Sequence, residues 1–162
     1  MKVVLSLIVV ALIAGCLLVW HSYRTVPASP EVLSSGTTYT TGTFGYVSMR
    51  LELAENVNAQ ETGLGGRTNV PDGYGMLFIF PIEGDYGFWM KDMQVPIDIF
   101  WLDDNGQVVT MKQTVSPDTY PNVFYPSSDV KYVLETRAGF ARDHQITIGS
   151  KLEGLPPSES VL

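Results

Sequence analysis

The segment FWMKDMQVPIDIFWLDDNGQVV, residues 88–109, contains two apolar runs and ends close to a turn signal. Asn105-Gly106 is the dipeptide most favoured in tight hairpin turns, because both residues tolerate a positive φ. We therefore expect residues 97–102 and 107–114 to form antiparallel strands joined by this turn. The segment thus predicts a β-hairpin preceded by a charged, irregular stretch.

Asp98 is the charged residue inside the first of these strands. Successive side chains of a strand point to opposite faces, so Asp98 shares its face with Phe100 and Leu102. An unpaired carboxylate in such apolar surroundings costs free energy. We therefore expect Asp98 to pair with a cation, either Lys91 or Arg67.

Alternating and short apolar runs predict the remaining elements. The fold class that they indicate is mainly β, a compact sandwich or barrel of the jelly-roll kind with one or two short helices. In the first helix, Asn58 is expected to provide the N-cap and Gly63 the end. The further strands are expected at residues 47–54, 75–80, 88–90, 132–136 and 146–149, and the helical segments at residues 58–62 and 138–144.

The N-terminus carries a long uncharged segment. Residues 3–20 contain no charged side chain and follow Lys2. A helix of that length spans roughly 27 Å, enough to cross the hydrocarbon core of a bilayer. We therefore expect residues 1–24 to be a membrane anchor or signal segment preceding an extracytoplasmic domain, so that the protein is a single-pass protein of the cell membrane.

The same segment permits two other interpretations. Residues 13–16, Ile-Ala-Gly-Cys, resemble a bacterial lipobox, in which Cys16 would be acylated after cleavage. Simple secretion after signal cleavage is the third possibility. Cys16 is the only cysteine of the chain, so the external domain has no disulfide.

Composition predicts the boundaries that follow the anchor. Residues 25–45 are rich in Ser, Thr, Gly and Pro and are expected to be a flexible linker. Residues 46–154 are expected to form a single, monomeric β domain, and residues 155–162 a tail.

Charge and motif content exclude several classes of function. The formal net charge of −7 argues against binding to nucleic acid, since phosphate contacts require basic residues. Among residues 46–154, His144 is the only histidine, so no metal site of His and Cys ligands is expected. The chain contains no P-loop, nucleophile elbow or dinucleotide fingerprint, and we expect no cofactor.

Three stretches together resemble the domain of unknown function 192 family. They are GLGGRTNVPDGYGMLFIF (63–80), the opening segment (88–109) and YVLETRAGFARDHQITIG (132–149). The resemblance implies a small β domain, often located behind a signal or anchor, with no established biochemical activity. The chain departs from the family pattern at Gly65-Gly66, where the family has methionine and a bulky residue, and at Asp92, where it has asparagine.

Charged and aromatic residues in these stretches form the candidate site. A polar cluster beside an aromatic side chain could bind a small ligand, or its ion pairs could serve only to fix the fold. Aromatic residues of the proline-rich loop expected at residues 115–129 could form the rim of a ligand groove or a lid on the core. The candidate ligand-binding residues are Arg67, Trp89, Lys91, Asp98, Tyr120, Tyr125 and Glu135.

These features lead to one principal hypothesis and two alternatives. The principal one is a membrane-tethered extracytoplasmic β domain that binds a small molecule or a component of the cell envelope. The first alternative is a hydrolase-type enzyme that uses Asp98 or Glu135 with Lys91. The second is a structural interaction module without a ligand.

Overall fold

The computed structural model describes residues 37–156 of the chain. The predicted anchor at residues 1–24 and the lipobox cysteine Cys16 lie outside the described residues. No helix within residues 37–156 has the length and apolar character required to cross a membrane.

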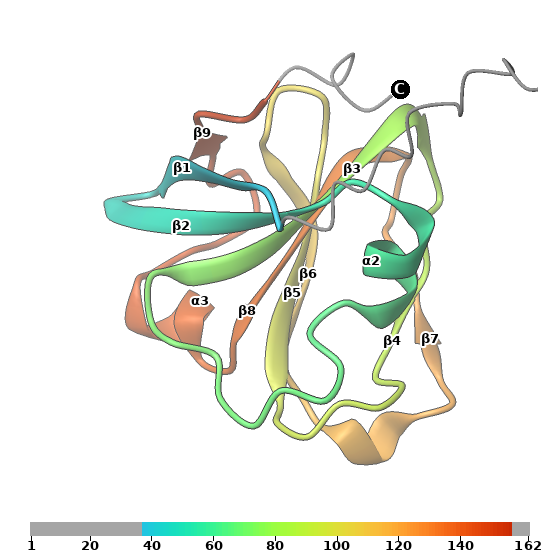
Figure 1. Ribbon diagram of the computed structural model, residues 1–162. Coiled ribbons are helices and arrows are strands. Elements are labelled where there is room, and N and C mark those ends of the chain that lie inside the picture. The colour runs from blue at the N-terminus through green and yellow to red at the C-terminus, as the bar shows by residue number, and fades with distance from the viewer. Residues whose placement is uncertain (1–36, 157–162) are drawn as a thin grey trace, which may run out of the picture. The chain divides into compact units, whose positions relative to one another are not determined.

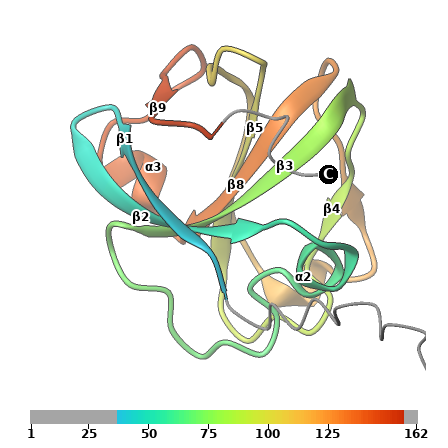
Figure 2. The ribbon, with the colours of Figure 1, turned by 45° about the horizontal axis from the view of Figure 1, so that its top comes forward.

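The main element is a seven-stranded sheet that curls into half a barrel (Figures 1 and 2). The strand order is β6-β5-β8-β3-β2-β1-β9, and a separate two-stranded ribbon pairs β4 with β7. Neighbouring strands are antiparallel except β2 and β3, which run parallel. The strands are β1 (Tyr39–Phe44), β2 (Val47–Ala54), β3 (Tyr74–Gly84), β4 (Phe88–Trp89), β5 (Ile97–Leu102), β6 (Val108–Val115), β7 (Val123–Phe124), β8 (Val130–Arg137) and β9 (Leu152–Glu153). The predicted class, mainly β with short helices, is confirmed.

The sheet is covered on both faces, and each face has its own apolar core. One core contains Leu77, Phe100 and Leu134 and is closed by Phe140 of α3 (Phe140–Asp143). The other contains the residues that alternate with these along the same strands, such as Phe78 and Trp101. It is closed by the β4–β7 ribbon and the loop after α2. Burial on both sides explains why β5 is buried at every position.

The N-cap of the first helix lies two residues earlier than predicted. The structure places α2 at Val57–Thr62, with Asn56 as the N-cap, and the Ala59 amide donates to its side chain over 2.9 Å. The prediction of Asn58 as the cap is therefore wrong. Gly63 ends the helix as predicted, with a φ of 53°. In the proline-rich loop, the structure adds a 3-10 turn, η1 (Pro117–Thr119).

The first strand lies inside the segment predicted as a linker. Residues 39–44 form β1, which pairs with β2 on one side and β9 on the other. The linker prediction for residues 25–45 is therefore wrong at its C-terminal end. Gly42, which contributed to that prediction, is required by close approach, because a Cβ there would lie 2.7 Å from the Glu153 carbonyl oxygen.

The predicted last strand is not a strand. Residues 146–149 form an irregular turn after α3, in which the Ile146 amide donates to the Ala141 carbonyl over 2.8 Å. Ile146 is buried and Ile148 is exposed, so the alternating sequence does not correspond to one buried face. The last strand is instead β9 at Leu152–Glu153.

Candidate functional site

A pocket of about 220 Å³ lies between α2, the end of β3 and the β4–β7 ribbon. The two-stranded ribbon lies beside α2 in Figures 1 and 2. Most of the lining is apolar or aromatic, with a few polar groups, which is the usual composition of a small-molecule site. The residues that line it are Val57, Gln60, Glu61, Thr62, Gly63, Leu64, Phe78, Phe80, Tyr86, Gly87, Phe88, Trp89, Lys91, Met93 and Glu135.

Glu135 is the buried carboxylate of this pocket. It lies on β8 opposite Met76 and Ile99, and only 4% of its surface is exposed. Burial raises the pKa of Glu135 to about 7, because desolvation disfavours the charged form. The Leu64 amide and the Arg67 charge oppose this increase in the pKa only in part.

The two oxygens of Glu135 have different environments. Oε2 accepts a hydrogen bond of 3.3 Å from the Leu64 amide. Within residues 37–156, Oε1 has no hydrogen-bond partner. Every fully buried side-chain oxygen or nitrogen in this part of the chain does have a partner, so Oε1 is not fully buried. Oε1 therefore keeps access to the pocket and can accept or donate a hydrogen bond there.

Aromatic side chains continue from the pocket to the surface. Trp89 lines the pocket and is 46% exposed, and its ring meets that of Tyr120 edge-on at a centroid distance of 6.3 Å. Tyr125 lies beside Gly87, where an added Cβ would be 2.6 Å from its ring. The structure thus brings Trp89, Lys91 and Glu135 to one pocket, with Tyr120 and Tyr125 next to its wall.

Arg67 has a partner that sequence reasoning missed. Its Nη2 donates to both carboxylate oxygens of Glu52, at 2.8 and 2.9 Å, and its Nη1 donates to the Tyr74 hydroxyl at 2.7 Å. The Tyr74 hydroxyl in turn contacts the Glu52 carboxylate. Burial, together with the negative charge of Glu52, raises the pKa of Tyr74. Arg67 does not line the pocket but fixes the loop that carries Leu64 over Glu135.

Asp98 does not pair with Lys91 or Arg67, so that prediction is wrong. Its carboxylate is fully buried and accepts three backbone hydrogen bonds, from Thr114 at 2.7 Å, Gly139 at 3.1 Å and Ala141 at 2.9 Å. Backbone amides satisfy the carboxylate as a cation would, and they belong to β6 and to the start of α3. Asp98 therefore joins three segments and takes no part in the pocket.

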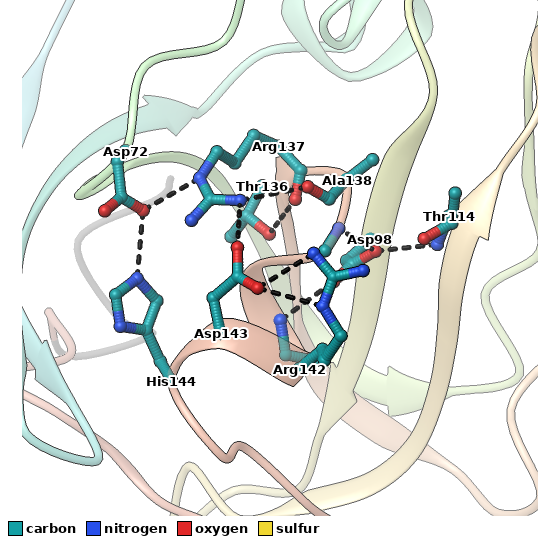
Figure 3. A network of polar contacts seen from close by, with 11 residues as sticks. Asp72, Asp98, Thr114, Thr136, Arg137, Ala138, Arg142, Asp143 and His144 are labelled. Carbon is teal, nitrogen blue, oxygen red and sulfur yellow. Dashed lines mark hydrogen bonds and ion pairs between the residues drawn. The ribbon is translucent and has the colours of Figure 1, made fainter.

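A second polar network surrounds α3 and was not predicted from the sequence (Figure 3). Arg137 donates to Asp72 and to Asp143, each over 2.9 Å, and His144 lies 3.0 Å from the same Asp72 oxygen. Hydrogen bonds from Arg137 and Arg142 lower the pKa of Asp143. These contacts connect the loop before β3 to α3 and lie at the protein surface.

Of the two carboxylates considered for a hydrolase together with Lys91, only Glu135 lies in the pocket. Asp98 and Glu135 lie on opposite faces of the sheet, as the register Asp98↔Thr136 and Ile99↔Glu135 requires. Only Glu135 and Lys91 of the three residues in that hypothesis line the pocket. Within residues 37–156, no group of three or more His, Cys, Asp or Glu side chains could hold a metal ion.

The chain belongs to the domain of unknown function 192 family, whose members are described as uncharacterized. Residues 38–154 match the sequence profile of this family. The family resemblance predicted from the three stretches is thus confirmed, and the match begins just before β1. No curated protein matches the chain.

Two solved structures share the fold. A "putative transcription regulator" from Sinorhizobium meliloti is 24% identical, with a TM-score of 0.69 over 74% of this chain and 96% of that one. A protein of unknown function from Novosphingobium aromaticivorans is 27% identical, with a TM-score of 0.69 over 78% of this chain and 94% of that one. Both structures are similar to this chain in the fold of the domain.

Proposed function

We propose that this chain is a membrane-tethered extracytoplasmic domain that binds a small molecule or a cell-envelope component. The single observation that carries the binding proposal is the pocket over Glu135. A buried carboxylate with one open oxygen lies beneath a largely aromatic wall there. Such a pocket with a perturbed carboxylate is the form that ligand sites usually take.

The pocket has two carboxylates, but Glu61 is exposed on α2, so only Glu135 is a buried acid–base group there. Glu135 alone reaches the pocket from the core, and Lys91 lies exposed at its edge. We therefore favour binding over hydrolysis. A purely structural role for Glu135 would predict that both of its oxygens are satisfied by the protein, which is not the arrangement observed.

A metabolite screen by thermal shift tests the binding proposal on the full-length protein. A ligand that binds only the folded state raises the unfolding temperature by mass action. The variant Val57→Trp adds bulk to an exposed position of the pocket wall, and Ile82→Trp is the matched control at an exposed position outside it. Ligand shifts that persist in Ile82→Trp and vanish in Val57→Trp support the proposal. Shifts of equal size in both variants, or no shift with any compound, contradict it.

The membrane placement is supported by the uncharged sequence of residues 3–20 after Lys2. Protease treatment of intact cells should remove the domain while the N-terminal segment stays in the membrane fraction. Protection of the domain would contradict the orientation. Cys16→Ser then separates the two anchors, because loss of membrane retention in this variant would favour acylation over an uncleaved helix.

A further inference from the structure

The pocket over Glu135 has a chemical preference that follows from its lining. Five of the lining residues are aromatic, and they belong to β3, β4 and the turn between these strands. The face of an aromatic ring carries negative electrostatic potential and attracts cations within about 6 Å of its centre. These residues are Phe78, Phe80, Tyr86, Phe88 and Trp89.

The aromatic wall is fixed by contacts among its own rings. Phe80 and Tyr86 stack with 3.6 Å between centroids, and Phe78 meets Phe88 edge-on at 4.8 Å. The Tyr86 hydroxyl also donates to the Ile82 carbonyl over 2.7 Å. A ligand therefore meets a wall that is already formed, which lowers the entropic cost of binding.

The charge of the lining also favours a cation. Besides Glu135, the charged residues that line the pocket are Glu61 and Lys91, so the ionised pocket has an excess of one negative charge. Lys91 and Glu61 are both exposed, so water screens their charges and leaves Glu135 as the dominant charge inside the pocket. Arg67 acts on Glu135 through space, but its own charge is paired with Glu52.

The size of the pocket limits its ligand. Sites for drug-sized molecules enclose about 300–1,000 Å³. The pocket here is smaller, about 220 Å³. It therefore suits a ligand smaller than a drug-sized molecule.

We propose that the ligand of this pocket is a small organic cation of the alkylammonium type, with its charged head against Glu135 and its alkyl groups against the aromatic wall. This inference rests on the proposed function, because it names the ligand class of the same site. Aromatic walls combined with a carboxylate satisfy both requirements of an alkylammonium ion, which needs a compensating charge and apolar contact.

Calorimetric titration of the full-length protein at pH 8 with choline and with 3,3-dimethylbutan-1-ol tests the inference. The two probes have the same shape, but the second has carbon in place of the charged nitrogen. We expect choline to bind about tenfold more tightly or better, as a cation–carboxylate contact inside a protein allows. Glu135→Gln should weaken choline binding and reduce this preference to the part that the aromatic wall provides, whereas Glu83→Gln, an exposed carboxylate outside the pocket, should retain it in full.

A second readout is the pH dependence of choline binding. Affinity should increase from pH 6 to pH 8 as Glu135 loses its proton, and it should be flat over this range in Glu135→Gln. Equal binding of the two probes, no binding of choline, or unchanged choline affinity in Glu135→Gln would overturn the inference. If the metabolite screen finds only neutral or anionic ligands that Val57→Trp excludes, the binding proposal stands and the cation inference fails.

Discussion

Asp98 and Glu135 are buried carboxylates on adjacent strands that are satisfied in different ways. Asp98 accepts three backbone hydrogen bonds, and all of its surface is removed from solvent. Glu135 accepts only one, from Leu64, and keeps one oxygen open to the pocket. A carboxylate with a complete set of donors is suited to hold the fold, whereas one with an open oxygen is suited to hold a ligand.

The first prediction concerns the pH dependence of stability at Glu135. Its pKa is about 7 in the folded protein against an ordinary value of 4.5, so the folded state holds the proton more tightly than the unfolded state. The contribution of Glu135 to the free energy of unfolding is therefore fully present below pH 4.5 and is lost as the pH rises through 7. The loss should be on the order of 3 kcal/mol, at about 1.4 kcal/mol per pKa unit.

Urea denaturation of the wild type and of Glu135→Gln across this pH range measures the effect. The wild type should lose stability relative to Glu135→Gln as the pH rises, because glutamine does not ionise. Glu83→Gln is the control and should follow the wild type at every pH. Parallel curves for the wild type and Glu135→Gln would show that Glu135 does not titrate near neutral pH in the folded protein.

The second prediction concerns Asp98 as a structural anchor. Asp98→Ala leaves the buried amides of Gly139 and Ala141, and the partly buried amide of Thr114, without their acceptor. Each buried donor without a partner costs about 1–3 kcal/mol, so the variant should lose roughly 3 kcal/mol or more. Chemical denaturation measures this loss. Asp85→Ala, at an exposed position, is the control, and a loss for Asp98→Ala no larger than for this control would refute the anchoring role.

At the scale of elements, the sequence predicted best those features that depend on neighbouring residues in the chain. The Asn105-Gly106 signal correctly predicted the β5–β6 hairpin, although the turn runs from Asp103 to Gly106 and only Gly106 of the pair has a positive φ. Residues 39–44 looked like a linker because threonine and glycine resemble linker composition, although β-branched threonine also suits a strand. Residues 146–149 have the alternating hydrophobicity of a strand, but they form a turn after α3. Alternation alone does not show whether a neighbouring strand is available for pairing.

The third prediction concerns the hairpin turn and its contact with β9. Gly106 has a φ of 80°, and a Cβ there would lie 2.5 Å from the Leu152 carbonyl oxygen. Gly66 has a φ of 75°, but a Cβ there would meet no atom within 4 Å. Gly66→Ala should therefore cost only the backbone strain, about 1 kcal/mol, whereas Gly106→Ala adds the clash and should cost about 2–4 kcal/mol.

Thermal or urea denaturation of the two variants separates strain from clash. The pair is matched because both glycines occupy loops with a positive φ of similar size. Equal losses for both variants would indicate that the contact between the hairpin and β9 contributes nothing measurable.

At the scale of the whole described domain, partners distant in sequence determine which of the candidate residues lie together. Trp89, Lys91 and Glu135 were predicted to belong to one site, and the pocket brings them together. The partners of Asp98 and Arg67 were not predicted, because backbone amides carry no sequence signal and Glu52 looked like an exposed residue of an alternating strand. Sequence reasoning identified the charged residues, but strand register and the loops packed on the sheet decide which of them meet.

The fourth prediction concerns where the folding unit begins. β1 pairs with both β2 and β9, so removing it leaves β9 without its strand partner and exposes the edge of β2. It also removes Phe44, which is fully buried, with its ring centroid 5.1 Å from that of Phe100. Loss of a buried phenylalanine side chain alone costs about 3–5 kcal/mol, which is comparable with the total stability of a marginal domain.

A fragment of residues 37–162 should therefore fold cooperatively, whereas a fragment of residues 46–162 should be unfolded or aggregate. Circular dichroism and urea denaturation of the two purified fragments make the comparison, and the full-length protein provides the reference midpoint. Addition of a synthetic peptide of residues 37–45 to the shorter fragment offers a further check, because a free strand can pair with an open sheet edge. If the two fragments showed the same midpoint and the same slope, β1 would be an accessory strand, and the folding unit would begin at β2 after all.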